Sequence, residues 1–182
     1  MTHVVNGFDL EALRGFVDAV KNGAVSPDVR FMAKSVWTGG TRADVTIDQF
    51  TAGGVNATPS ERSFNLPLDE PLAMGGEDTA PNPLENLAAG LCGCITAGIV
   101  SNASMFGANV EGLEVLVEAD INVLGLFGLD RSVPSTRNRI TYTVKLNGED
   151  QTALLKSKQV IDSKSPAPNT LTNAMELVTQ IA

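Results

Sequence analysis

The stretch between Glu85 and Glu111 contains no charged residue, and it is the feature that most constrains how this chain can fold. Leucines and isoleucines recur along it at helical spacing, and alanines and glycines stand between them. Small residues let another helix or a sheet approach closely. The spacing therefore predicts one long helix from Pro83 to about Phe106 at the centre of the fold, with Asn82 as its N-cap.

The same stretch is long enough to cross a bilayer, but several polar residues interrupt it: Asn86, Ser101, Asn102, Ser104 and Asn109. A buried helix is therefore expected, with no membrane partner. The net charge of −8 disfavours binding to nucleic acid, which is itself polyanionic. The first residues lack the basic start and apolar core of a secretory signal. We expect a cytoplasmic protein whose cysteines are reduced thiols.

Helical and extended patterns alternate along the chain, and their order predicts an α+β fold. Around the central helix we expect helices over Asp9–Lys21 and Asp150–Ser163, a hairpin of Arg30–Trp37 and Thr41–Phe50, a strand over Arg62–Leu68, paired strands Leu113–Val123 and Arg139–Leu146, a turn at residues 164–173, and a final strand over Glu176–Ile181.

The two cysteines, Cys92 and Cys94, lie one residue apart within the predicted central helix. Two helical positions differ in direction by about 200°, so the side chains diverge and a disulfide between them would require unwinding. The sole histidine is His3, so neither an imidazole base nor a full set of metal ligands is expected, and we predict no metal or cofactor. The cysteines are then either reactive thiols or buried, packed side chains.

The run "NPLENLAAGLCGCITAGI" resembles the central-helix signature of the OsmC/Ohr family of thiol peroxidases. "VWTGGTRADVTIDQF" is similar to the family's N-terminal hairpin, "EADINVLGLFGLD" to the strand and loop after the helix, and "SPAPNTLTN" to its closing turn. The resemblance begins near Phe31, which makes residues 1–29 a helical extension and residues 30–182 an OsmC-like domain. It implies an OsmC-like α+β fold, with antiparallel sheets packed on the central helix in an intertwined homodimer.

The resemblance also implies a reaction. In the family, a reactive thiolate attacks an organic or hydrogen peroxide, becomes a sulfenic acid, and is captured by a second cysteine as a disulfide. Register from Pro83 gives Cys94 the reactive position, and Arg42 matches the arginine that holds the thiolate. Ser165 stands at the resolving position, where a hydroxyl cannot form the disulfide. An external thiol would then have to reduce the sulfenic acid.

The candidate catalytic residues are Cys94, Arg42 and Glu85. Glu85 lies one residue after Leu84, which stands where the Ohr branch of the family has a glutamate that pairs with the arginine. The alternatives are a packed thiol for Cys94, a solvated hairpin residue for Arg42, and a carboxylate that complements the helix N-terminus for Glu85.

Three apolar residues stand on the loop after the predicted strand Leu113–Val123: Leu126, Phe127 and Leu129. They form either a packing surface or the apolar wall of a pocket over the thiol. The sequence thus predicts a peroxide reductase with one reactive cysteine. The alternative is a non-catalytic OsmC-like protein that binds a small apolar ligand in the dimer cleft, and a third hypothesis makes Cys92 and Cys94 a paired redox or metal sensor.

Overall fold

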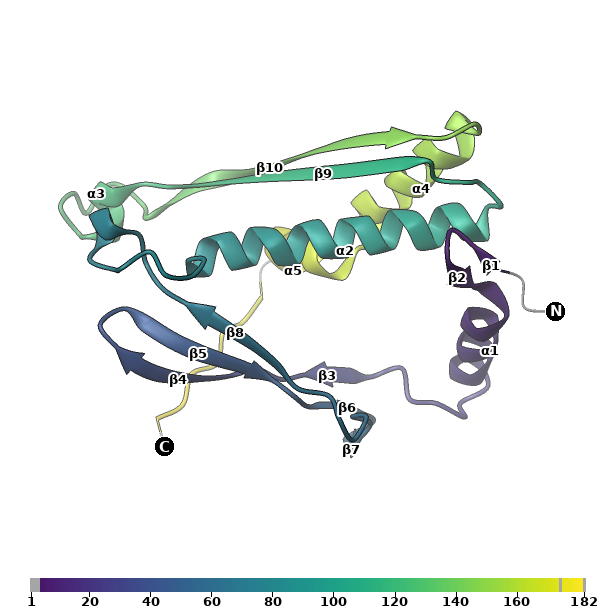
Figure 1. Cartoon of the computed structure of the whole chain (residues 1–182), viewed down its shortest axis with the longest axis horizontal. Coiled ribbons are helices and arrows are strands. Elements are labelled where there is room, and N and C mark those ends of the chain that lie inside the picture. Colours follow the sequence, from purple (N-terminus) through teal and green to yellow (C-terminus); the bar gives the residue numbers. More distant parts are fainter. Residues whose placement is uncertain (1–3, 174, 182) are drawn as a thin grey trace. The chain divides into compact units, whose positions relative to one another are not determined.

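The computed structural model describes residues 4–173 and 175–181, and it has an α+β architecture (Figure 1). His3 lies outside the described residues. The chain divides into two compact units. The N-terminal unit is Asp9–Asn86, and the C-terminal unit runs from Leu87 onward and includes residues 4–8. The domain boundary between residues 29 and 30 stays a prediction.

The N-terminal unit contains one helix and two small antiparallel sheets with strand orders β4-β5-β8 and β3-β6-β7. Its elements are α1 (Leu10–Lys21), β3 (Val29–Phe31), β4 (Lys34–Gly39), β5 (Arg42–Ile47), β6 (Phe50–Ala52), β7 (Val55–Asn56), β8 (Phe64–Leu68) and the 3-10 helix η1 (Leu72–Met74).

Helix α1 begins and ends where the sequence predicts. The Asp9 carboxylate accepts hydrogen bonds from the backbone N–H groups of Glu11 and Ala12, both at 3.0 Å, which satisfies donors that have no partner within the helix. Asn22 is the C-cap, and Gly23 follows with a φ of +78°, a conformation that glycine adopts without strain. The predicted helix over Asp9–Lys21 is confirmed.

The predicted hairpin of two long strands is wrong in one respect, because each strand is divided between the two sheets. Phe31 pairs with Phe50, whereas Lys34 pairs with Thr46, so the register shifts by one residue between these pairs. Residues 32–33 and 48–49, which lie between these pairs, belong to neither ladder. The chain therefore changes sheet on both sides of the hairpin. The strand predicted over Arg62–Leu68 is confirmed as β8.

The C-terminal unit is built on the long helix α2 (Pro83–Met105), whose first residues still belong to the N-terminal unit. The other elements are β1 (Val4–Val5), β2 (Phe8–Asp9), β9 (Gly112–Ile121), α3 (Val123–Leu126), β10 (Thr136–Asn147), α4 (Gln151–Lys164) and α5 (Pro166–Thr172). Figure 1 shows β9 and β10 as a two-stranded antiparallel ribbon that runs along α2.

The core of the C-terminal unit lies between α2, α4 and the β9-β10 ribbon. Ile95 and Ile99 of α2 and Ile161 of α4 are buried together, and side chains of β9 and β10 pack against them. Closer to the end of α2, Ala103 and Leu154 are buried in a second cluster. Among the described residues α2 is the helix long and apolar enough to span a membrane, and its Ile95, Ile99 and Ala103 are buried in these two clusters.

Two predictions near the C-terminus are wrong. The predicted turn at residues 164–173 contains a helix, α5, because Pro166 stands at its first position, where a missing N–H costs no intrahelical hydrogen bond. The predicted strand over Glu176–Ile181 has no regular structure, and Leu177 and Ile181 are fully exposed or nearly so. A strand forms only when its backbone groups find a partner ladder.

The sequence analysis missed a short hairpin before α1. Asn6 and Gly7 both have positive φ and connect β1 to β2, as Asn-Gly pairs do in tight hairpins. The Asn6 amide donates to Ser104 Oγ and Ala108 O, each at 2.9 Å, and its oxygen accepts from Val110 N at 2.9 Å. These bonds hold residues 4–8 against the end of α2.

Candidate active site

Cys94 lies beside Ser165 within the C-terminal unit. Cys94 Sγ is 3.1 Å from Ser165 Oγ, a hydrogen bond in which either atom can be the donor. Cys94 is half-buried, and Ser165 is 3% exposed at the junction where α4 ends and α5 begins. The structure therefore brings the predicted reactive position and the predicted resolving position into contact.

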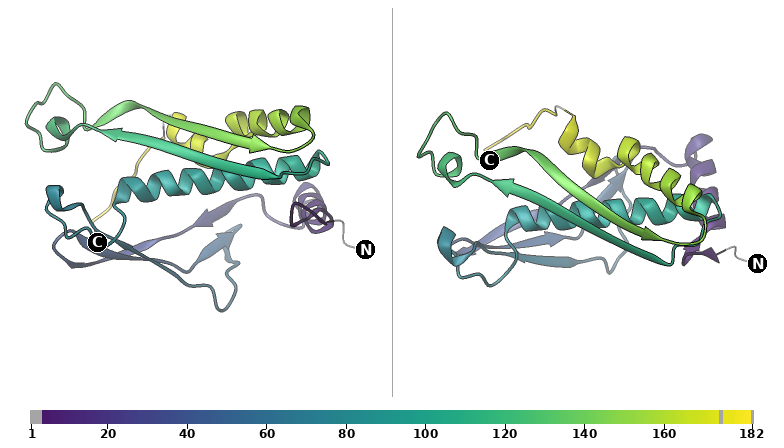
Figure 2. Two further views of the ribbon diagram at one scale, coloured as in Figure 1. Left: turned by 45° about the horizontal axis from the view of Figure 1, so that its top comes forward. Right: turned by 90° about the horizontal axis from the view of Figure 1, so that it is seen from above.

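The packing of α2 against α4 sets this contact. A Cβ added to Gly98 would overlap with Cδ1 of Ile161, so the glycine permits the two helices to approach closely. Cys94 lies one turn before Gly98 on α2, and Ser165 lies one turn after Ile161 at the end of α4. The helices are antiparallel, so these one-turn steps lead to the same place, and Figure 2 shows α4 and α5 following one another along α2. The predicted role of the small residues in close packing is confirmed at Gly98.

Cys92 points to a different neighbour. Its Sγ donates to the backbone oxygen of Val115 on β9 at 3.6 Å, which is the sheet side of α2. Both cysteines are free thiols. The divergence expected from the helical spacing is thus confirmed, and it separates the packed thiol Cys92 from the thiol that contacts Ser165.

Arg42 forms an ion pair with Glu77 in the N-terminal unit. The distance from Arg42 Nη1 to Glu77 Oε2 is 2.7 Å, and the two side chains are 43% and 63% exposed. Exposed pairs of this kind contribute about 0–1 kcal/mol, because water and salt compete for both charges. The guanidinium is therefore held loosely, and a stronger anion can displace the carboxylate.

A buried carboxylate, Asp69, organises the residues around this ion pair. It is 1% exposed, and it accepts hydrogen bonds from the Thr41 hydroxyl at 2.6 Å and from the Thr79 hydroxyl at 2.8 Å. Backbone N–H groups of Glu70, Glu77 and Thr79 also donate to it. The Thr41 hydroxyl, together with these other donors, holds the pKa of Asp69 well below its usual range despite burial. Asp69 thereby fixes the residue before Arg42 and the backbone of Glu77.

Glu85 closes the N-terminus of α2. Its carboxylate accepts from Asn82 N at 2.8 Å, and the Asn82 side chain accepts from Glu85 N at 2.8 Å, which is a capping box. The predicted N-cap at Asn82 and the interaction of Glu85 with the helix N-terminus are both confirmed. These hydrogen bonds give Glu85 a capping role, and a catalytic role for it stays a prediction.

Leu126, Phe127 and Leu129 are exposed in this chain, at 45%, 57% and 72%. They belong to α3 and the turn after it, at one end of the β9-β10 ribbon (Figure 1). Their predicted exposure is confirmed, whereas a role as a pocket wall stays a prediction.

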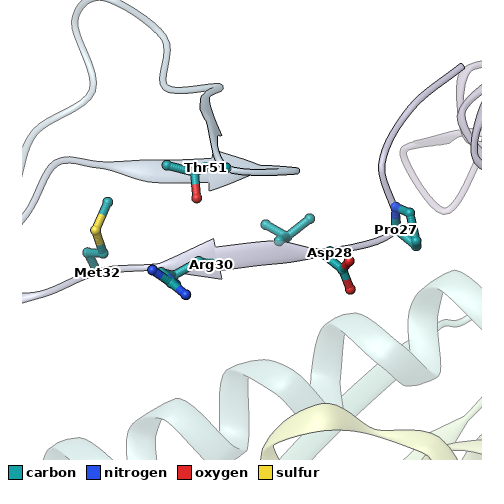
Figure 3. Close-up of a pocket in the computed structure, with 7 residues that line it drawn as sticks. Pro27, Asp28, Arg30, Met32 and Thr51 are labelled. Atoms are coloured by element: carbon teal, nitrogen blue, oxygen red, sulfur yellow. The ribbon is translucent and has the colours of Figure 1, made fainter.

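An open cavity of about 490 Å³ lies on the N-terminal unit, along β3 and β6 (Figure 3). Asp28, Arg30, Met32 and Thr51 are among the residues that line it. None of the predicted site residues lines this cavity, and its lining contains no thiol.

The residues from Gly75 to Gln180 match a family model described as OsmC-like protein. This chain belongs to the OsmC-like family. The structure is similar to an OsmC-like protein of Mycoplasma pneumoniae, with a TM-score of 0.57 and 15% identity over 79% of this chain and 87% of that one. It is also similar to a protein of Psychrobacter arcticus 273-4 named for osmotic stress and detoxification, with a TM-score of 0.56 and 15% identity over 76% and 85% of the two chains. At this identity the likeness establishes the fold. No curated protein matches the chain.

Sequence reasoning missed Asp69 and Glu77 as functional neighbours of Arg42. Both stand in the polar segment between β8 and α2, where the sequence indicates loop residues without fixing their contacts. The signal for Asp69 is an acidic residue directly after a strand, followed by a loop that supplies many free N–H groups. Glu77 has no comparable signal, because its partner lies 35 residues away.

Proposed function

We propose that this OsmC-like protein is a hydroperoxide reductase that acts through one reactive cysteine, Cys94, and uses an external thiol as reductant. The observation that carries the proposal is the contact between Cys94 Sγ and Ser165 Oγ at 3.1 Å. In the family, the position of Ser165 belongs to the cysteine that captures the oxidised sulfur. Its proximity to Cys94 supports Cys94 as the sulfur to be oxidised, and its hydroxyl excludes internal capture.

The first step is attack of the Cys94 thiolate on the terminal oxygen of a hydroperoxide. A sulfur–oxygen bond forms, the oxygen–oxygen bond breaks, and the alkoxide leaves and takes a proton to become an alcohol. The sulfur loses two electrons and becomes a sulfenic acid. An external thiol then forms a mixed disulfide with Cys94 and releases water, and a second thiol restores Cys94 by thiol–disulfide exchange. The balance is one hydroperoxide and two thiols to one alcohol, one water and one disulfide.

Arg42 is proposed to hold the thiolate, as the resemblance implies. Its exposed ion pair with Glu77 is weak enough to exchange for a thiolate without a large cost. Asp69 fixes the backbone on both sides of this pair through Thr41 and Glu77. The backbone beside Arg42 is therefore held in place, while the guanidinium is free to exchange Glu77 for another anion.

A homodimer in the cytoplasm is part of the proposal. The sheets of the N-terminal unit expose large apolar side chains, including Phe31 at 71%, Val36 at 54% and Trp37 at 73%. Exposed large apolar side chains on sheets are what an interface with another chain would cover. A second copy of the chain, intertwined as in the family, is the partner that we propose for it.

The test is steady-state reduction of an alkyl hydroperoxide with dithiothreitol. Turnover is expected in the wild-type chain and in Cys92→Ser, and we expect it to be absent from Cys94→Ser. Equal loss in both variants, or no turnover in the wild-type chain, would contradict the proposal. In the latter case, thermal stabilisation by small apolar molecules would favour the alternative of a binding protein.

A second variant tests the resolving position. Ser165→Cys places a sulfur beside Cys94, because the present side chains are in contact at 3.1 Å. Peroxide should then produce an intramolecular disulfide between residues 94 and 165, seen as the loss of two titratable thiols. If instead the variant accumulates a sulfenic acid that can be trapped, the two positions do not act on one another.

A further inference from the structure

We propose that the Ser165 hydroxyl is a catalytic hydrogen-bond donor to the Cys94 sulfur, which favours the thiolate. In the family, a cysteine at this position captures the sulfur after it has been oxidised. Here the serine would activate the same sulfur before the reaction. The inference rests on the proposed function, because it supplies that reaction's nucleophile with an activating contact inside the same unit of the protein.

The Ser165 hydroxyl contacts Cys94 Sγ and makes no hydrogen bond that caps α5. Ser165 is the N-cap of α5, a position where serine usually accepts from the N–H of the second or third helical residue. Here it makes no such bond. Pro168 occupies the third position and has no N–H, and Pro166 occupies the first. The "SPAP" sequence removes the N–H of the third position, and the Cys94 sulfur is the side-chain hydrogen-bond partner of the hydroxyl among the described residues.

The backbone of Ser165 is fixed on both sides. Its N–H donates to Ile161 O at 3.1 Å, which ends α4, and its C=O accepts from Asn169 N at 3.0 Å, which begins α5. The residue is 3% exposed, so bulk water does not compete for the hydroxyl. The donor is therefore preorganised toward Cys94.

Ionisation of Cys94 gives the hydrogen bond one direction. A thiol can donate to the hydroxyl or accept from it, but a thiolate carries no proton and can only accept. Hydrogen bonds to an ionised acceptor are about twice as strong as neutral ones. The contact therefore stabilises the thiolate more than the thiol, and the thiolate is the form that attacks peroxide.

Among the titratable groups on the elements packed against α2, five are paired with one another, whereas Lys164 directly precedes Ser165 and its side chain is exposed. Tyr142 of β10 donates to Asp162 of α4, and Lys158 pairs with the same carboxylate at 2.7 Å. On the outer side of the ribbon, Lys145 pairs with Glu114 at 2.7 Å. Apolar side chains of β9 and β10, and Tyr142, pack on the cluster that contains Ile95 and Ile99. The serine hydroxyl is thus the polar side chain that contacts Cys94 in this unit.

The experiment is a titration of the thiolate by its ultraviolet absorbance in a Cys92→Ser background, where Cys94 is the single thiol. The protein contains one tyrosine, Tyr142, which absorbs in the same region when it ionises. Burial, together with the adjacent Asp162 carboxylate, raises the pKa of Tyr142 to about 12, so the range below pH 10 reports the cysteine.

Ser165→Ala should move the midpoint of this titration upward by about one pH unit, which lowers the thiolate fraction well below the midpoint about tenfold. Ser157→Ala is the matched control. Ser157 is also buried on α4, but its hydroxyl donates to Ala153 O at 2.8 Å, so the midpoint should not move. Ser165→Thr keeps the hydroxyl and should restore the midpoint.

The two proposals fail in different ways. An unchanged midpoint in Ser165→Ala, with peroxide turnover present in the wild-type chain, overturns the donor role and leaves the reductase. A raised midpoint without turnover in the wild-type chain supports the donor role and removes the reductase. A midpoint that rises equally in Ser157→Ala also overturns the inference, since a general packing change would then explain the shift.

Discussion

The two units bury their apolar side chains to very different extents. In the C-terminal unit, Ile95, Ile99 and Leu154 are completely inaccessible, and strand residues pack around them. In the N-terminal unit, Leu10 is the buried apolar side chain among the described residues, while Trp37 and others on the sheets are exposed. The N-terminal unit instead buries a charged group, Asp69, whose carboxylate accepts five hydrogen bonds.

The two units therefore differ in what holds their candidate site residues in place. The C-terminal unit holds Cys94 and Ser165 on helices fixed by their own hydrophobic core, so the geometry of the thiol does not depend on a partner. The N-terminal unit presents Arg42 on strands whose apolar faces need further cover, which the proposed second copy would provide. The Cys94–Ser165 contact thus lies within one unit, whereas the proposed role of Arg42 depends on the proposed assembly.

The largest effect is expected in the core of the C-terminal unit. Ile99→Ala removes a completely buried side chain between α2 and the ribbon, and should lower the free energy of unfolding by about 2–5 kcal/mol. Urea unfolding followed by circular dichroism measures this. A cost below about 1 kcal/mol would show that this core is not the stable part of the molecule.

Close packing of the helices predicts the next largest effect. Gly98→Ala forces a Cβ against the end of the Ile161 side chain at a cost of about 1–3 kcal/mol, from which the helix preference of alanine subtracts up to about 1 kcal/mol. Gly93→Ala is the matched control, since a Cβ there meets no atom within 4 Å and alanine favours a helix by up to about 1 kcal/mol. Destabilisation by Gly93→Ala of the same size as by Gly98→Ala would mean that another surface covers this face of α2.

Association tests the exposed sheets of the N-terminal unit. Trp37→Ala should weaken the proposed dimer about tenfold or more, which corresponds to about 1.4 kcal/mol, and should leave the isolated chain nearly unchanged. Sedimentation over a range of protein concentrations measures the dissociation constant. Leu177→Ala serves as an exposed control outside the sheets. A wild-type chain that stays monomeric at high concentration would contradict the proposal that a second copy covers the exposed apolar side chains of the N-terminal sheets.

A separate effect, which depends on pH, is expected from Asp69. Its pKa is lowered in the folded chain, chiefly by the Thr41 hydroxyl, so its contribution is present above the unfolded value of about 3.9 and is lost as the pH falls below it. The stability difference between the wild-type chain and Asp69→Asn should be constant near neutral pH and should shrink below about pH 4. A difference that stays constant down to acid pH would contradict this assignment.

Patterns that act within one element were readable from the sequence. The limits of α1, the Asn82 cap and the length of α2 follow from local spacing and end signals. Features that depend on contacts between residues far apart in the sequence could not be predicted from it. The register shift between Phe31 and Lys34, the Asn6 clamp on α2 and the Arg42–Glu77 pair join residues that local patterns do not relate.

The candidate site divides along the same line. The resemblance assigned Cys94 and Ser165 to positions that the structure places 3.1 Å apart. It also predicted residues 164–173 as a turn. It therefore missed that a helix begins after Ser165 and that the Ser165 hydroxyl makes no capping hydrogen bond to it. The chemistry of a residue type could be inferred from the sequence. Which group its side chain hydrogen-bonds to could be learned only from the structure.

The most direct test of the central claim is to trap the oxidised sulfur. The wild-type chain is treated with one equivalent of an alkyl hydroperoxide in the presence of dimedone, which reacts with sulfenic acids, and the adduct is located by peptide mass spectrometry. We predict one adduct per chain, on Cys94, with Cys92 unmodified. An adduct on Cys92, or a chain that leaves the peroxide intact and both thiols titratable, would contradict the assignment of Cys94 as the reactive thiol.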